Sequence, residues 1–72
     1  MEVKIGVQSI PRELVVETPS SPDEVERSLL AALKDGGMFT LRDERGGQVM
    51  VPVEKIGYVE LSGAETRRIG FG

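Results

Sequence analysis

A single helical stretch, with short alternating segments on both sides of it, constrains the fold of this chain more than any other feature. Ser21 can cap the first free amides, Pro22 suits the first helical position, and Glu24 completes a capping box. The glycine pair at 36–37 predicts the end of the helix, because glycine adopts the left-handed cap conformation without steric cost. We therefore expect one helix over 21–34.

The apolar residues of this helix form one stripe. They recur at the spacing of a single helical face, at Val25, Leu29, Ala32 and Leu33, with Leu30 at the margin. An isolated helix of this length is marginal in water, so it needs a surface on which to bury the stripe. The segments before and after it must supply that surface.

Those segments alternate apolar and polar residues with the period of a strand that has one buried face. They cover 2–8, 13–17, 38–42, 49–53, 58–61 and 66–71. The short first connection and the polar, glycine-bearing turn at 43–47 each predict a hairpin, with a tight corner at 53–56 and another turn at 62–65. Pro52 lacks an N–H, which predicts that its side of the strand is unpaired or bulged.

The expected fold is a single α+β domain over residues 1–72, in the order β-β-α-β-β-β. One mostly antiparallel sheet of five to six strands would carry the single helix on one face, and a strongly bent, partly closed barrel plugged by the helix is the alternative. The predicted core consists of Val3, Ile5, Val7, Leu14, Val16, Val25, Leu29, Leu33, Phe39, Leu41, Val49, Val51, Val59, Leu61, Ile69 and Phe71.

Composition removes several classes of function. The chain has no cysteine and no histidine, so the usual zinc ligands and the usual neutral-pH base are missing, and we expect no metal and no cofactor. Its net charge of −3 argues against nucleic acid as a partner, because proteins that bind it normally carry a basic footprint. No apolar run could span a bilayer, and the N-terminus opens into a strand pattern, so we expect a cytoplasmic protein without a membrane partner.

Five stretches of the sequence, taken together, resemble a known family. They are MEVKIGV at 1–7, PREL at 11–14, LRDERG at 41–46, IGYVE at 56–60 and RRIGFG at 67–72. The whole chain resembles a family of small actinobacterial proteins of unknown function. The resemblance implies a cytoplasmic actinobacterial protein, and it brings no catalytic or binding residues with it.

The residues give little support for catalysis or for a phosphate-binding loop. The helix begins with a proline, which lacks an amide N–H, and with two acidic residues, which repel phosphate. The glycine pair lies at the C-terminal end of the helix, where the helix dipole disfavours anions. The carboxylates at Glu13, Glu17, Asp43, Glu44, Glu54 and Glu60 lie on strand faces or in turns. A paired acid and base would need a cleft, for which one small sheet leaves little room. We therefore predict that the chain is not an enzyme, and a hydrolase that uses carboxylates is the least favoured reading.

One face of the predicted sheet is a candidate contact surface. If Val59 and Leu61 point to the helix, alternation places Tyr58 on the opposite face. The residues that share this predicted face are Lys4, Val15, Met38, Thr40, Arg42, Met50, Tyr58, Glu60 and Arg68. Apolar groups rimmed by arginine are typical of interfaces, although scattered apolar residues on a sheet surface are equally common.

We therefore expect an interaction module that binds a protein partner or a second copy of itself. It would use the helix-free face of the sheet, with Tyr58, Arg68, Arg42, Met50, Val15 and Lys4 as contact residues, or an exposed strand edge near Pro52 or the last strand. The alternative is a small nucleotide- or nucleic-acid-binding domain. It would use Arg67 and Arg68, with Lys4, Arg12 or Arg42, for phosphate and Tyr58 for stacking.

Overall fold

The computed structural model of the chain describes residues 1–63 and 66–71. Its elements are β1 (Glu2–Val7), β2 (Glu13–Glu17), α1 (Pro22–Asp35), β3 (Met38–Arg42), β4 (Gln48–Pro52), the short 3-10 helix η1 (Val53–Lys55), β5 (Ile56–Leu61) and β6 (Arg67–Gly70). The predicted α+β class and the order β-β-α-β-β-β are confirmed.

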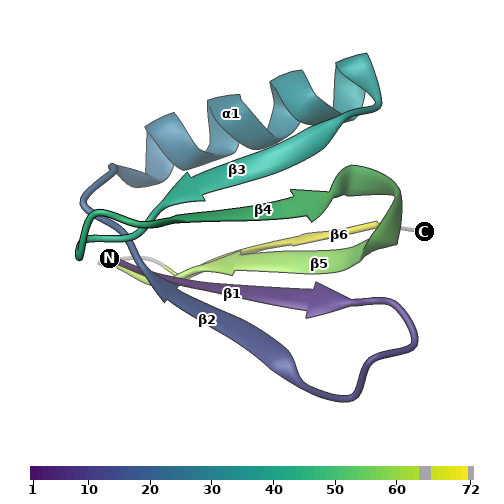
Figure 1. The fold of residues 1–72 in the computed structure, drawn as a ribbon, viewed down its shortest axis with the longest axis horizontal. Coiled ribbons are helices and arrows are strands. Elements are labelled where there is room, and N and C mark those ends of the chain that lie inside the picture. The colour runs from purple at the N-terminus through teal and green to yellow at the C-terminus, as the bar shows by residue number, and fades with distance from the viewer. Residues whose placement is uncertain (64–65, 72) are drawn as a thin grey trace.

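The six strands are divided between two antiparallel sheets instead of forming one. Sheet A has the order β2-β1-β5-β6, and sheet B is the β3-β4 hairpin. Figure 1 shows α1 alongside β3, and the ion pairs of Arg67 with Asp23 and Glu26 place the beginning of β6 next to the same helix. Sheet B and α1 together cover the apolar face of sheet A, so a hairpin and a helix share the covering role that the sequence assigned to the helix alone.

One backbone hydrogen bond joins the tip of sheet B to sheet A, and a second extends the β3–β4 pairing by one residue pair at its open end. At the tip of the hairpin, the Glu44 N–H donates to the carbonyl of Glu17 on β2, at 2.9 Å. At its open end, the Val53 N–H donates to the carbonyl of Gly37, just after the helix, at 3.0 Å. Sheet B therefore runs from the outer edge of β2 to the corner at which η1 leads into β5.

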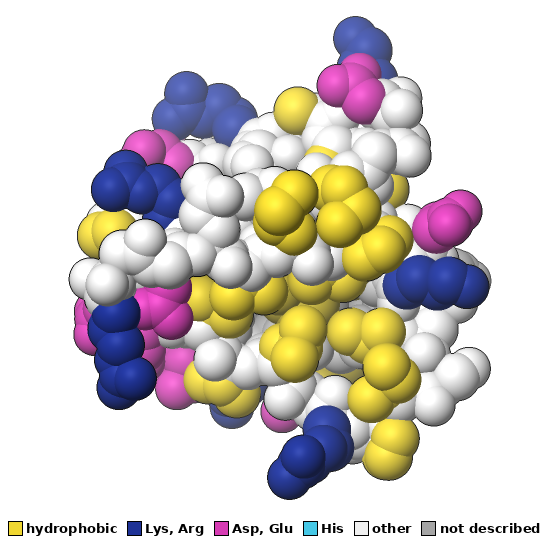
Figure 2. Space-filling view, in the orientation of Figure 1, with side chains coloured by type: hydrophobic (Ala, Val, Ile, Leu, Met, Phe, Trp, Pro, Cys, Tyr) yellow, Lys and Arg dark blue, Asp and Glu magenta, His cyan; other side chains and the backbone are white. Residues whose placement is uncertain are grey.

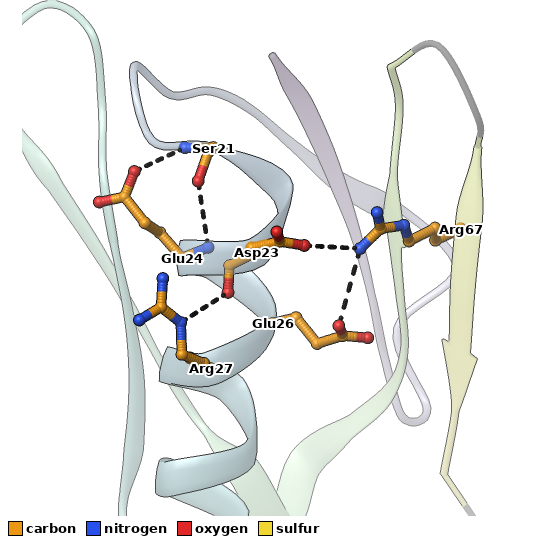
Figure 3. Close-up of polar contacts among 6 residues, drawn as sticks. All are labelled: Ser21, Asp23, Glu24, Glu26, Arg27 and Arg67. Carbon is orange, nitrogen blue, oxygen red and sulfur yellow. Dashed lines mark hydrogen bonds and ion pairs between the residues drawn. The ribbon is translucent and has the colours of Figure 1, made fainter.

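The predicted ends of the helix are confirmed to within one residue. The Ser21 hydroxyl accepts from the Glu24 N–H at 3.2 Å, and the Glu24 carboxylate accepts from the Ser21 N–H at 3.0 Å, as a capping box requires (Figure 3). The bond from the Ser21 N–H to the carboxylate lowers the pKa of Glu24, and the Ser21 hydroxyl beside that carboxylate acts in the same direction. Gly36 ends the helix in the left-handed region, at φ 70°.

The alternation predicted for the strands is also confirmed. The buried apolar residues are Val3, Ile5, Val16, Val25, Leu29, Ala32, Phe39, Leu41, Val51, Val53, Ile56, Val59 and Leu61. Four further members of the predicted core, Val7, Val49, Ile69 and Phe71, are partly buried and pack against this cluster. The side-chain parity that places Tyr58 away from the helix is therefore correct.

Two predicted core residues were assigned wrongly. Leu14 is 40% exposed and Leu33 is 37% exposed, although Leu14 has the strand parity and Leu33 the helical spacing of core residues. Leu14 lies on the edge strand β2, near its beginning, and Leu33 lies in the last turn of α1. Because the sequence pattern fixes only the direction of a side chain, it could not reveal that the packed core ends before it reaches either residue.

The corner at 53–56 contributes more to the core than the sequence indicated. Val53, the first residue of η1, and Ile56, which follows η1 directly, are both buried. Thr18 is also fully buried, and its hydroxyl accepts from the Ser20 N–H at 3.2 Å. The turn predicted at 62–65 includes Ala64 and Glu65, which lie outside the described residues.

An ion pair connects the last strand to the helix. The Arg67 guanidinium lies 3.2 Å from the carboxylate of Asp23 and 3.7 Å from that of Glu26, both on α1 (Figure 3). Arg67 is the first residue of β6, so this pair joins the beginning of an edge strand of sheet A to the first turns of the helix.

Candidate functional site

The face of sheet A that points away from α1 and sheet B, here called the helix-free face, is ordered in cross-strand rows. One row reads Glu13, Gly6, Tyr58, Gly70 across β2, β1, β5 and β6. The next row reads Val15, Lys4, Glu60, Arg68. Side chains directly opposite one another on neighbouring strands are close enough to interact, so these rows define the contacts that the face can make.

Tyr58 lies across its neighbouring strand instead of standing out from the sheet. Gly6 is directly opposite it on β1, and a β-carbon at Gly6 would overlap the aromatic ring. The missing side chain lets the ring cross β1, and the Tyr58 hydroxyl donates a hydrogen bond to the carboxylate of Glu13 on β2. A single tyrosine therefore spans three strands of sheet A.

Two charged residues act on this tyrosine. The bond to Glu13 raises the pKa of the Tyr58 hydroxyl, since phenolate would face a carboxylate and lose that bond, while Arg68 acts in the opposite direction. The Arg68 guanidinium lies over the ring, 4.1 Å from its centroid. This distance is within the range of a cation–π interaction. The result is a stack of Arg68 on Tyr58 on the backbone of Gly6, hereafter the Tyr58 stack.

The structure brings four of the six nominated contact residues together. Tyr58, Arg68, Lys4 and Val15 all lie on the helix-free face, in the two rows described above. Val15 is the most exposed apolar residue of this group, at 56%. Lys4 pairs weakly with Glu2 on its own strand, at 3.9 Å. These four residues form one mixed surface of apolar, aromatic and basic groups.

The other two nominated residues lie elsewhere. Arg42 and Met50 belong to sheet B, on the face opposite the buried Phe39 and Leu41. Alternation predicted their direction correctly relative to their own strands. It could not reveal that those strands belong to a separate sheet, so the six residues do not form one surface.

A partly open pocket of about 190 Å³ is lined by Val15, Glu17, Asp43, Glu44 and Arg45, where the hairpin tip meets β2. In the described ranges 1–63 and 66–71, no group of three or more acidic side chains is placed to hold a metal ion.

In the same part of the chain, no helix is long and apolar enough to cross a membrane.

Sequence reasoning missed one member of the Tyr58 stack, Gly6, and the role of its hydrogen-bond partner, Glu13. Gly6 was assigned only as a residue of a strand, and Glu13 only as a solvated carboxylate. A glycine inside a strand often marks a close approach by another group, and this was the one available signal. The pairing of Gly6 with Tyr58 depends on register, which the sequence alone did not provide.

Comparison with known proteins identifies the chain at the level of its family. No curated protein matches the chain at a significant level. A family model described as "Protein of unknown function (DUF3107)" matches residues 1–72, which is the whole sequence. The expectation of a family of unknown function is confirmed, and the chain belongs to this family.

Proposed function

We propose that this chain is a non-enzymatic interaction module that binds a protein partner, or a second copy of itself, through the helix-free face of sheet A or an adjoining strand edge. The observation that carries the proposal is the surface formed by the Tyr58 stack and Val15. Tyrosine and arginine are enriched at the centres of interfaces, and here they are held in a fixed arrangement.

The side chains of this surface are already restrained before a partner binds, and this supports the proposal. Binding through flexible side chains costs conformational entropy, because each one must be immobilised. The Tyr58 ring is already restrained by Glu13, Arg68 and the backbone of Gly6. A partner that docks on the stack would therefore lose less free energy to ordering than on an ordinary solvated sheet face.

Capture of partners from native lysate tests the face. The Tyr58→Ala/Arg68→Glu double variant removes the stack, and we expect it to lose proteins that the unchanged chain retains. Leu30→Ala/Lys34→Glu is a matched control, because it also truncates one large side chain and reverses one cation, on exposed positions of α1. Equal capture by the unchanged chain and the Tyr58/Arg68 variant would show that the proposed face is wrong.

Sedimentation of the pure protein tests self-binding separately. If the partner is a second copy, the apparent mass will rise with concentration for the unchanged chain and will stay monomeric for the Tyr58→Ala/Arg68→Glu variant. A strict monomer over a wide concentration range would remove the self-binding form of the proposal and would leave the heterologous form to the capture experiment.

Nucleotide or nucleic-acid binding is the second candidate, and the contacts favour it less. Tyr58 already carries Arg68 over its ring, so a base could stack there only after that guanidinium moved. Arg67 lies against Asp23 and Glu26 and is less available for phosphate. NMR titration with ATP and with short single-stranded RNA tests this candidate, which predicts shifts clustered at Tyr58 and Arg68.

Actinobacterial origin and a cytoplasmic location, which the sequence resemblance implies, are part of the same proposal. Fractionation of cells that express the untagged chain tests the location. Recovery of the chain with the membrane or secreted fraction would contradict it.

A further inference from the structure

Within residues 1–63 and 66–71, the outer edge of β2 has backbone groups that no other strand uses. In an antiparallel pair, residues alternate between those whose backbone groups bond to the partner strand and those whose groups point away from it. Met1 and Thr18 exchange both hydrogen bonds, at 2.9 Å each. Counting back from Thr18 in the register of β1 and β2, Val16 and Leu14 bond to β1. The backbone groups of Glu13, Val15 and Glu17 therefore point outward.

The hairpin tip of sheet B occupies only one of these outward groups. The carbonyl of Glu17 accepts from Glu44, which agrees with the outward direction derived from the register. Within residues 1–63 and 66–71, β2 pairs with β1 alone, and no backbone bond to Val15 is found on this edge. The edge is thus closed at its C-terminal end and open around Val15.

Apolar side chains are exposed on both sides of this open edge. Leu14 points to the core side and is 40% exposed, and Val15 points to the helix-free face and is 56% exposed. In Figure 2 the face turned to the viewer is hollowed near its centre, and hydrophobic side chains lie in the hollow and around it, between the regions of β4 and β2. Proteins usually protect such edges with lysine, proline or a bulge, and none of these occurs within Glu13–Glu17.

The charges around the edge distinguish between a second copy and a different protein. Both ends of β2 are glutamates, and the pocket beside its C-terminal end is lined by three carboxylates, of Glu17, Asp43 and Glu44, and by one cation, Arg45, so that its balance is acidic. A second copy that overlapped the whole strand in antiparallel register would place Glu13 opposite Glu17 of the partner at both ends. Like charges directly opposite one another destabilise a strand pair. The edge therefore disfavours self-pairing and favours a basic strand.

We propose that an extended, basic segment of another protein pairs with the outer edge of β2 and extends sheet A by one strand. This inference rests on the proposed function as an interaction module, and it names the chemistry of the partner. The outward backbone groups of Val15 and Glu13 bond to the segment, and its apolar side chains cover Leu14 on one side and Val15 on the other. Strand addition of this kind gains affinity from backbone hydrogen bonds and specificity from alternate side chains.

The direction of the bound segment follows from sheet A, in which every neighbouring pair is antiparallel. A segment antiparallel to β2 begins near Glu17, at the end lined by Asp43 and Glu44. Lysine or arginine at its N-terminal end therefore meets the acidic pocket of about 190 Å³, and the following residues run along Val15 toward Glu13.

NMR titration of the full chain with defined peptides tests the proposal. The probe is a synthetic peptide of about eight residues, with two N-terminal lysines followed by Val-Val-Thr-Val-Val-Thr, which places valine on both sides of the added strand. We expect shifts of the backbone amides of Glu13, Val15 and Glu44. The same peptide with two glutamates should bind roughly tenfold more weakly, because two attractive charge contacts become repulsive. N-methylation of the peptide amides that face β2 should abolish the shifts.

A charge-reversed protein is the decisive control. Glu17→Lys/Glu44→Lys changes two exposed side chains and keeps the backbone bond between those residues, so it should invert the preference and favour the glutamate peptide. Absence of shifts with the lysine peptide at millimolar concentration would overturn the proposal. So would equal binding of both peptides, or shifts confined to β6.

The same titration separates this inference from the proposed function. If the lysine peptide binds normally to the Tyr58→Ala/Arg68→Glu variant while that variant loses its lysate partners, both proposals stand at neighbouring sites. If capture depends on Tyr58 and Arg68 but no peptide binds at β2, the strand-addition proposal alone fails. If the peptide binds and capture is unchanged by the variant, the edge stands and the Tyr58 stack is excluded as the contact surface.

Discussion

Replacement of Leu29 by alanine tests the packing of the helix on which the fold depends. Leu29 is fully buried in the middle of the α1 stripe, whereas Leu30, the next residue, is 54% exposed. Truncation of a buried leucine removes its hydrophobic contacts and leaves a cavity, which together cost about 3 kcal/mol. The same truncation at Leu30 removes few contacts and should change the free energy of unfolding by less than about 0.5 kcal/mol.

These magnitudes are large relative to the stability of so small a domain. At 0.05–0.15 kcal/mol per residue, the chain of 72 residues should unfold with roughly 4–11 kcal/mol. The Leu29→Ala variant would thus lose between a quarter and most of its stability. For a domain of this size, each kcal/mol lowers the melting temperature by about 4–8 °C, so we expect a decrease of about 12–24 °C.

Urea unfolding followed by circular dichroism measures both variants against the unchanged chain. We expect a much lower midpoint for Leu29→Ala and an unchanged midpoint for Leu30→Ala, with similar slopes for all three. Equal losses at the two positions, or a larger loss at Leu30, would refute the orientation of α1 and with it the identity of the covered sheet face.

Three further predictions follow from single contacts. Tyr58 is the only tyrosine, so the ultraviolet absorbance of phenolate reports it alone; its midpoint should lie above about 10, and Glu13→Gln should lower it. Because the folded pKa is raised, this contact stabilises the fold below the ordinary pKa and is lost as pH rises through the folded pKa; identical midpoints would contradict it. Ser21→Ala should cost about 1 kcal/mol in urea unfolding, whereas Ser28→Ala, within α1, should cost much less; equal costs would argue against the capping box. Arg67→Ala should cost less than about 1 kcal/mol at low salt and nothing measurable at high salt, and a loss independent of salt would rule out an ion-pair origin.

The helix and the parity of the strands were predictable because they depend on neighbours in sequence. Ser21 and Glu24 are three residues apart and bond to each other wherever the chain forms a helix, and Gly36 ends that helix through its own backbone freedom. Alternation in a strand likewise repeats every two residues. The directions of Tyr58 and Val59 could therefore be assigned before their neighbours were known.

The extent of the core could not be predicted in the same way. Leu14 and Leu33 point in the correct direction but lie at the margin of the packed core, and the sequence pattern holds no information about where that margin falls. Arg42 and Met50 were grouped with Tyr58 on the assumption of one continuous sheet. The division into sheets A and B separates them, since hydrogen-bonding partners between distant strands are not encoded by local periodicity.

By itself the amino-acid sequence determined the elements, their order and the side of each strand that is apolar, since each of these follows from residues within a few positions of one another. Only the tertiary structure decided that Gly6 lies beneath Tyr58, that Glu13 accepts a hydrogen bond from the Tyr58 hydroxyl, and that the edge of β2 is open beside an acidic pocket. These features join residues up to 45 positions apart, and the register of paired strands, a property of the whole packed molecule, brings them together.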